Sequence, residues 1–254
     1  MIRMLALTAT VVSIFFAGSA SAAELKLLSA LVMKPALSEL SGDFERTTGH
    51  KLTISYDSAG AVKNRLQGGE AADVVIIQKP VVEGLVKEGK IIFSSNIILG
   101  RSGVGAAVAH GASKPDISST EAFKLALLAA KSIAYPVPDA GHASGIHFRG
   151  VIERLGIATE VNAKAKLMEG SVADFAAHDS ADIVISQPME ILAAPAYELV
   201  GWLPPELQDY ERFTWAMGIT ATSKEPGAAD ALVKFLSGPA AASIIKAKGM
   251  EPGS

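Results

Sequence analysis

The chain has 254 residues, with 23 Lys and Arg against 26 Asp and Glu, for a formal net charge of −3. Because nucleic-acid-binding proteins normally carry a basic surplus, this balance disfavours that class, and no nucleic-acid partner is expected. The sequence contains no cysteine, which excludes disulfides, thiolate metal sites, cysteine nucleophiles and a lipid-modified N-terminal cysteine.

The first 22 residues have the pattern of a cleavable export signal. Arg3 supplies a positive start, residues 5–17 are almost wholly apolar, and Ala20-Ser21-Ala22 offers the small-x-small pattern that a signal peptidase cuts. The apolar stretch is shorter than the ~20 residues of a membrane-spanning helix, which disfavours the alternative of an uncleaved anchor. We therefore expect residues 1–22 to be a signal peptide and the mature chain to be periplasmic.

The first part of the mature chain alternates strands with helices. In the first helix Leu37, Leu40 and Phe44 recur at helical spacing, and Gly49 follows as a left-handed cap. The β-α-β-α-β-α order predicts a mostly parallel sheet. We expect strands at 25–28, 51–56 and 74–77, and helices at 35–48, 59–67 and 81–87.

A second unit of the same kind follows. We expect its strands at 103–109, 133–136, 183–186 and 199–202, and its helices at 119–130, 145–155 and 172–178. A strand at 213–221 then crosses back, and helices at 228–236 and 240–248 complete the first unit.

The predicted fold class is therefore α/β with two lobes, each a mostly parallel sheet flanked by helices. Residues 23–102 and 218–254 form lobe 1, and residues 103–217 form lobe 2. Two crossing strands, near residues 100–105 and 216–220, serve as the hinge. A two-lobe α/β protein places its ligand between the lobes, at the carboxyl ends of the strands.

Three predicted strand-to-helix junctions carry small residues. Small residues let backbone N–H groups approach a ligand closely, and the unpaired N–H groups at a helix N-terminus favour an anion. Any one junction taken alone is better explained as an ordinary helix cap. Three of them at matching places in two lobes predict a small anionic ligand. They are Ser29-Ala30, Ser58-Ala59-Gly60 and Ala143-Ser144-Gly145.

Five stretches follow one another in a fixed order, namely Phe44-x-x-x-Thr48-Gly49, Ser58-Ala59-Gly60-Ala61, Ala72-Asp73-Val74, Ser144-Gly145-Ile146 through Leu155-Gly156, and Phe235 through Gly249. Together they resemble the periplasmic molybdate-binding proteins, which are type II periplasmic binding proteins feeding ABC importers. The resemblance covers nearly the whole mature chain. It implies a hinged two-lobe fold, an oxyanion held by backbone N–H groups and hydroxyls, an ABC permease in the inner membrane as partner, a monomer, and no cofactor.

The sequence departs from this family at three hydroxyl ligands. The resemblance places serines near Val32 and Ala59 and a tyrosine near Ile185, where this chain has apolar side chains. Neighbouring serines are candidate replacements for these hydroxyls. They are Ser29, Ser58 and Ser186.

Charged and polar residues near the predicted cleft leave a second ligand class open. An arginine fork with a histidine donor would suit a di- or tricarboxylate. The candidates are Arg65, Arg149, His142, His147 and Gln187, with Asp57 as a helix cap or a partner of Arg65. The two arginines fit a solvated helix face equally well, and His147 fits packing within its helix.

The predicted ligand-binding set combines the junctions with these candidates. It comprises Ser29, Ala30, Val32, Ser58, Ala59, Arg65, His142, Ser144, Gly145, Ile185 and Gln187.

Enzyme and sensor functions have less support in the sequence. The stretch Gly141-His142-Ala143-Ser144-Gly145 is similar to the nucleophile turn of a serine hydrolase, but its serine stands one position late. The five histidines are scattered, which disfavours a metal-centred site. The ligand-sensing domain of a transcription regulator shares the fold, but the export signal argues against it. We expect a binding protein for molybdate or a related oxyanion and not an enzyme, with hydrolysis as the most remote alternative.

Overall fold

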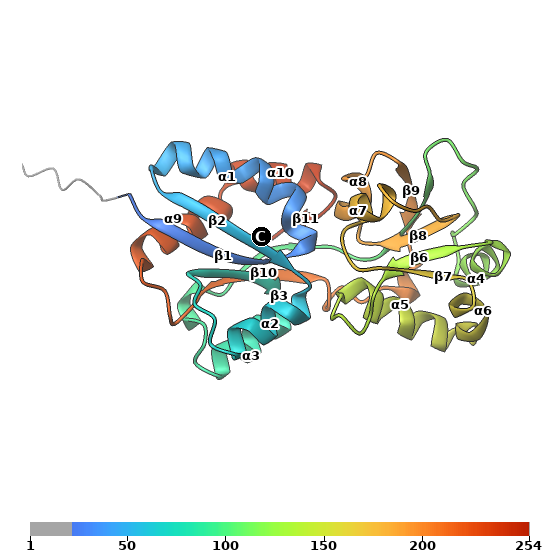
Figure 1. The fold of residues 1–254 in the computed structure, drawn as a ribbon, viewed down its shortest axis with the longest axis horizontal. Coiled ribbons are helices and arrows are strands. Elements are labelled where there is room, and N and C mark those ends of the chain that lie inside the picture. The colour runs from blue at the N-terminus through green and yellow to red at the C-terminus, as the bar shows by residue number, and fades with distance from the viewer. Residues whose placement is uncertain (1–21, 254) are drawn as a thin grey trace, which may run out of the picture.

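The computed structural model describes residues 22–253, which fold into two lobes that each contain one sheet (Figure 1). The predicted signal peptide lies outside the described residues, apart from Ala22. The two-lobe α/β fold class is confirmed.

The first lobe contains a six-stranded sheet in the order β11-β4-β10-β3-β1-β2. β1 pairs in parallel with β2 and β3, whereas β10 is antiparallel to β3 and β4. The strands are β1 (Glu24–Ala30), β2 (Lys51–Asp57), β3 (Val74–Gln78), β4 (Ile97–Arg101), β10 (Thr214–Ile219) and β11 (Glu251–Pro252).

Helices lie on both faces of this sheet. Figure 1 shows α1, α9 and α10 on one side and α2 and α3 on the other. The helices are α1 (Lys34–Thr48), α2 (Ala59–Gln67), α3 (Lys79–Lys87), α9 (Pro226–Leu236) and α10 (Pro239–Ala247), with short 3-10 helices η1 (Leu31–Met33) and η2 (Phe93–Ser95).

The second lobe contains a five-stranded sheet in the order β7-β6-β8-β5-β9. β6 pairs in parallel with β7 and β8, and β5 is antiparallel to β8 and β9, so both sheets are more mixed than expected. The strands are β5 (Gly105–Ala109), β6 (Ile133–Pro136), β7 (Ala165–Met168), β8 (Ile183–Ser186) and β9 (Tyr197–Trp202). The helices are α4 (Thr120–Ala129), α5 (Ala143–Arg154), α6 (Ala158–Asn162), α7 (Val172–Ala176), α8 (Pro188–Leu192) and the 3-10 helix η3 (Pro205–Leu207).

Local sequence signals set the boundaries of the helices that were predicted. Gly49 ends α1 with a φ of 76°, a left-handed conformation that glycine adopts without strain. Ser58 caps α2 by accepting a hydrogen bond from the backbone N–H of Ala61, and Ser119 caps α4 in the same way. The elements not predicted were all short, namely β4, β7, β11, α6, α8 and the 3-10 helices η1, η2 and η3.

The chain crosses between the lobes at residues 102–104 and again at 203–213. The two crossings are hydrogen-bonded to each other, because the N–H of Leu203 donates to the Val104 carbonyl oxygen at 2.9 Å. The Gln208 side chain accepts from the Val104 N–H at 3.0 Å and donates to the Val104 carbonyl oxygen at 2.8 Å. One amide side chain therefore joins both hinge segments.

The predicted position of the second crossing is wrong. Residues 216–220 and the lobe boundary at 218 fall within or next to β10, which pairs with β3 and β4 of the first sheet. The apolar run of β10 predicted a strand correctly, but only its strand partners show to which lobe it belongs. The return crossing therefore ends before Thr214.

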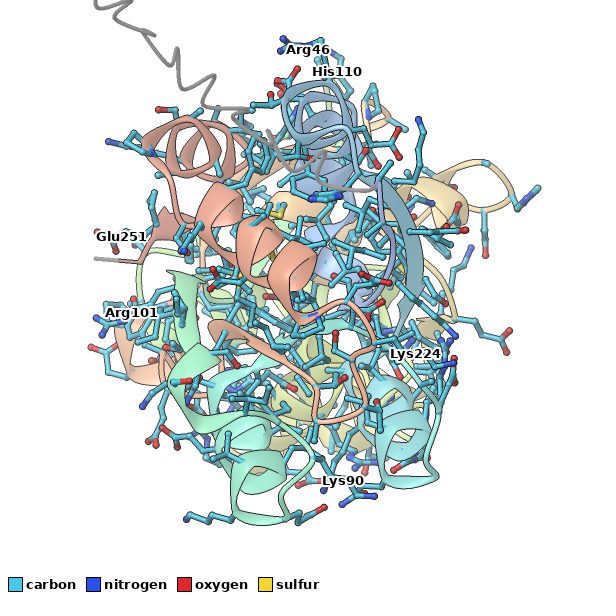
Figure 2. The ribbon with its side chains drawn as sticks, turned by 90° about the vertical axis from the view of Figure 1, so that its left-hand side faces the viewer. Arg46, Lys90, Arg101, His110, Lys224 and Glu251 are labelled. Atoms are coloured by element: carbon cyan, nitrogen blue, oxygen red, sulfur yellow. The ribbon has the colours of Figure 1, made fainter. Side chains whose placement is uncertain are left out.

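The last two long helices pack on the first lobe. The Phe235 ring of α9 meets the Phe44 ring of α1 edge-on, with 5.5 Å between ring centroids. Charged side chains of this lobe, including Arg46, Lys90 and Lys224, project outward at the periphery (Figure 2). Within residues 22–253 no single helix is long and apolar enough to cross a membrane, and α9 with α10 reaches that length only as a pair bent by 57°.

Gly145 supplies a test of how closely α5 must approach its sheet. A Cβ atom on Gly145 would overlap the carbonyl oxygen of Pro136 in β6. We expect Gly145→Ala to lower the free energy of unfolding by about 1–3 kcal/mol, because the obstacle is backbone rather than a movable side chain. Gly150→Ala on the same helix is the matched control, since a Cβ atom there would have no neighbour within 4 Å. That control should be neutral or stabilising by about 0.5–1 kcal/mol. Equal urea midpoints for the two variants would contradict the close approach.

Candidate functional site: the interlobe cleft

A small cavity lies between the lobes, where β1, β2, β6 and β8 end. Its volume is about 20 Å³, which is room for one water molecule. The first lobe lines it with Ala30, Leu31, Val32, Ser58, Ala59 and Trp215, and the second with His142, Ala143, Ser144, Gln187 and Glu190. Because the space is so small, the lobes are closed, and a larger ligand requires them to separate.

Direct contacts hold the lobes in this closed arrangement. The Ser58 hydroxyl donates to the Ala140 carbonyl oxygen at 2.5 Å, and the Gly60 N–H donates to the Gly141 carbonyl oxygen at 3.3 Å. A Cβ atom on Gly60 would lie 2.9 Å from the Gly141 Cα. Two glycines therefore allow the backbones of the two lobes to touch beside the cavity.

The first turn of α5 brings backbone donors to the cavity. Among the residues that the structure describes, the N–H groups of Ala143, Ser144 and Gly145 have no hydrogen-bond acceptor, and the Ser144 hydroxyl also has no partner. At the start of α2, by contrast, Gly60 and Ala61 already donate to protein acceptors. Unpaired N–H groups at the positive end of a 12-residue helix favour a negative ligand.

Two further polar groups at the cavity are buried without partners. The Trp215 indole nitrogen and the Gln187 side-chain oxygen have no hydrogen bond within residues 22–253. Because buried polar atoms nearly always have a partner, these atoms are available to a ligand or water. Trp215 was missed in the sequence, because its apolar strand predicts only core packing.

Glu190 is a buried carboxyl at the cavity, and sequence reasoning missed it too. It is 7% exposed, and the Ser186 hydroxyl donates to its Oε2 at 2.7 Å. Burial raises the pKa of Glu190 to about 7, although the hydrogen bond from Ser186 acts in the opposite direction. The side chain is therefore partly protonated near neutral pH and can both donate and accept.

Glu190 also borders a second and larger cavity between the lobes. This cavity measures about 220 Å³ and shares Leu31 and Glu190 with the first. Its other walls come from α1, α7 and the end of α8, and they include the cation Lys34 and the hydroxyls of Ser38 and Ser171. The cleft therefore has a small chamber lined with neutral donors and a larger chamber with a lysine.

The structure brings most of the predicted set together. Seven members line the small cavity, namely Ala30, Val32, Ser58, Ala59, His142, Ser144 and Gln187. The other four do not line it, namely Ser29, Arg65, Gly145 and Ile185.

The predicted arginine fork is not placed at the cavity. Arg65 donates to Glu70 at 2.7 Å from Nε and lies 3.6 Å from Asp57, while Arg149 pairs with Asp139 at 2.7 Å. The ion pair with Arg65 is also the main reason why the pKa of Glu70 falls to about 2. Both guanidinium groups are thus bound to carboxylates of this chain.

The two histidines differ in their positions. His142 lines the cavity, with its Nε2 3.1 Å from the Glu169 carbonyl oxygen, and burial lowers its pKa, so that it is mostly neutral at pH 7. His147 packs toward the hinge, with its Nε2 2.6 Å from the Leu207 carbonyl oxygen.

The serines expected to replace the family's hydroxyl ligands are all hydrogen-bonded within the protein. Ser29 donates to the Ala30 carbonyl oxygen at 3.1 Å, Ser58 to Ala140, and Ser186 to Glu190. The side chains of Val32 and Ala59 line the cavity without a polar group. The replacement hypothesis is therefore not supported in this closed arrangement.

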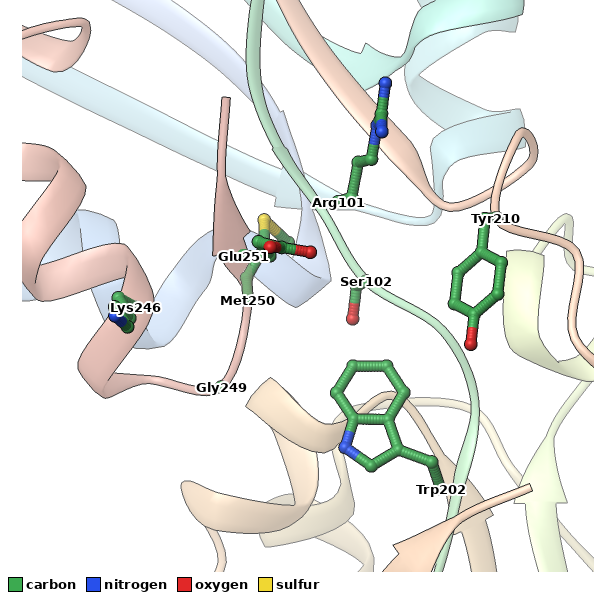
Figure 3. Close-up of a pocket in the computed structure, with 8 residues that line it drawn as sticks. All are labelled: Arg101, Ser102, Trp202, Tyr210, Lys246, Gly249, Met250 and Glu251. Atoms are coloured by element: carbon green, nitrogen blue, oxygen red, sulfur yellow. The ribbon is translucent and has the colours of Figure 1, made fainter. Parts of the chain in front are cut away.

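A larger hollow of about 560 Å³ lies beside the hinge, away from these strand ends (Figure 3). Figure 3 shows Arg101, Ser102, Trp202 and Tyr210 around it. None of the predicted ligand residues lines it. Within residues 22–253, no three His, Asp or Glu side chains are grouped to hold a metal ion.

The sequence model of the bacterial extracellular solute-binding proteins matches residues 25–251. The chain belongs to this family. It is 32% identical over 235 residues to an aconitate isomerase of a Pseudomonas species, covering 90% of this chain and 87% of that relative. It is 31% identical over 242 residues to the molybdate-binding protein ModA of Azotobacter vinelandii, covering 91% of both chains.

Solved structures agree on the fold. The periplasmic molybdate-binding protein of Azotobacter vinelandii superposes with a TM-score of 0.73 at 24% identity, covering 91% of this chain and 100% of that one. The resemblance read from the sequence is thereby confirmed at the level of family and fold. One relative of this solute-binding family is named as an enzyme of an organic acid and the other as a binder of an oxyanion.

The pH dependence of stability tests the burial of Glu190. Its folded pKa of about 7 lies above the value of 4.5 for an exposed carboxyl, so folding favours the protonated form. Its contribution to stability is fully present below pH 4.5 and is lost as the pH rises through 7. Gln cannot ionise, so Glu190→Gln should gain about 3 kcal/mol relative to the wild type between pH 4.5 and 8. Urea unfolding at both pH values measures this gain. A difference in the free energy of unfolding between variant and wild type that is the same at both pH values would contradict the burial of Glu190.

Proposed function

We propose that this protein is exported to the periplasm, captures a small anion between its lobes and presents it to an ABC permease of the inner membrane. The observation that carries this proposal is the pair of unbonded backbone donors of Ala143 and Ser144 at the start of α5, two residues that line a cavity built by both lobes. In a closed, dry cleft, each hydrogen bond to a negative charge is stronger than in water. Because Trp215 of the first lobe and Ser144 of the second both reach the cavity, a bound ligand favours the closed form.

We propose that the ligand is a small organic acid with two or more carboxylates. The apolar Val32 and Ala59 and the engaged serines leave few hydroxyls for a tetrahedral oxyanion. A protonated Glu190 forms a strong hydrogen bond with a carboxylate, and Lys34 in the larger chamber can receive a second carboxylate. Aconitate, a tricarboxylate, is also the compound for which the Pseudomonas relative is named.

Molybdate or a related oxyanion is the second candidate. The small chamber offers neutral N–H donors and no Lys or Arg among its lining residues, an arrangement that holds a compact dianion through helix and side-chain dipoles. The molybdate-binding relative at 31% identity supports the same ligand.

A ligand panel read by fluorescence separates the two candidates. The chain has two tryptophans, so Trp202→Phe leaves Trp215 in the cavity as the reporter. We expect cis-aconitate, trans-aconitate and citrate to change the Trp215 emission and raise the melting temperature, and molybdate, tungstate, sulfate and phosphate to leave both unchanged. The opposite pattern would assign an oxyanion ligand. A panel in which no anion binds would overturn anion capture.

Replacing single residues tests which groups hold the ligand. Ser144→Ala should weaken the affinity for the panel's best ligand about 10-fold or more, because a hydrogen bond to a charged group is lost. Ser243→Ala, on the exposed face of α10, is the matched control and should leave the affinity unchanged. Arg65→Gln should also leave it within a factor of about 3, because the guanidinium lies outside the cavity. Calorimetric titration measures the ligand affinity of all three variants. A large loss of affinity in Arg65→Gln would support the predicted arginine fork.

A further inference from the structure

Anion capture uses Glu190 only as a hydrogen-bond donor and gives no role to its ability to lose a proton. Glu190 is the acidic residue that the small and large chambers share, so a ligand spanning both chambers passes beside it. Its carboxyl is hydrogen-bonded by one side chain, Ser186, which contacts Oε2. The backbone N–H of Gln187 also stabilises the ionised carboxyl, and among the described residues no second side chain hydrogen-bonds to it, so the carboxyl can exchange a proton with a ligand.

The other titratable groups of the two chambers are less suited to exchange a proton. His142 has its Nε2 at the Glu169 carbonyl oxygen. Asp174 of α7 accepts from both the Ser171 hydroxyl and the Ser171 N–H, and these bonds hold its pKa below the usual range. Lys34 of α1 is a cation suited to fix a ligand carboxylate.

We propose that Glu190 is a catalytic residue that carries a proton between two carbons of the ligand, so that the cleft isomerises an unsaturated polycarboxylic acid. This inference rests on the organic-acid ligand proposed above. The substrate class is an acid whose C=C bond lies next to a CH₂ group that itself bears a carboxylate. The family relative named aconitate isomerase acts on a compound of this class.

The proposed reaction is a one-base proton shift. The Glu190 carboxylate removes a proton from the CH₂ group, and the C–H electron pair forms a new C=C bond while the old one opens toward the neighbouring carboxylate. The same carboxyl then returns its proton to the far carbon of the former double bond. One C–H bond breaks and one forms, the double bond moves by one carbon, and no cofactor, oxidant or water is consumed. In aconitate the shifted product has the same skeleton, so the shift interconverts the cis and trans isomers.

The cleft supplies what this reaction requires beyond the base. The intermediate is an enolate, whose added charge lies on carboxylate oxygens, and the unbonded N–H groups of α5, with the Trp215 indole N–H, are donors for that charge. Closure of the lobes excludes water, so the proton stays on Glu190 until it returns to the ligand. A carboxyl with a pKa of about 7 is matched to proton transfer at neutral pH.

The test uses the protein with cis-aconitate and trans-aconitate as probes, followed by proton NMR. We expect the wild type to interconvert the two isomers and, in D₂O, to return mostly the original proton, so that little deuterium enters the product in each turnover. Glu190→Gln should reduce the rate at least 100-fold while the affinity for both probes, read from Trp215 fluorescence, changes less than 10-fold. Glu153→Gln, the same exchange on the exposed face of α5, is the matched control and should keep the full rate.

A second variant keeps the inference testable if Glu190→Gln does not fold. Ser186→Ala removes the hydrogen bond that lowers the pKa of Glu190, so the rise of the rate with pH should move to higher pH. A merely structural role of Ser186 would lower the rate equally at every pH. Binding of both probes without interconversion, or interconversion undiminished in Glu190→Gln, would overturn this inference alone. Failure of both probes to bind would overturn the proposed ligand class as well.

Discussion

The unbonded backbone N–H groups at the start of α5 are the feature on which the cleft depends. They can face the first lobe because Gly145 has no side chain, which lets the first turn of α5 rest against the Pro136 carbonyl of β6. Helix polarity then places partial positive charge at the cavity without a cation. The proposed anion site is thus made by a backbone position, and the side chains of Ser144, Trp215 and Gln187 line the same cavity.

Closure of the lobes links this site to the rest of the molecule. Gly60 and Gly141 allow backbone contact beside the cavity, and two crossings, hydrogen-bonded to each other through Gln208, connect the lobes. A cavity of only about 20 Å³ shows how closely the two lobes fit together at the strand ends. A ligand shifts the balance between open and closed forms only through contacts that it makes with both lobes.

In the proposed reaction, Glu190 is the group that adds isomerisation of the ligand to its binding. Neutral donors that stabilise a carboxylate also stabilise the enolate derived from it, since both carry negative charge on the same oxygens. In such a site, a single buried carboxyl that can gain and lose a proton is enough to add chemistry to binding. Two relatives of this chain carry names of both kinds, since one is named for aconitate isomerisation and the other for molybdate binding.

The sequence alone determined the features that depend on neighbouring residues. The helical spacing of α1, the caps at Ser58 and Gly49, and the small residues before α2 and α5 act over a few positions, so the two-lobe fold and seven cavity residues could be predicted. Only the tertiary structure decided the strand partners of β10, the pairing of Arg65 with Glu70, and the burial of Trp215 and Glu190. These depend on contacts between segments that are remote or that face each other only after folding, and neither hydrophobic spacing nor residue type specifies them.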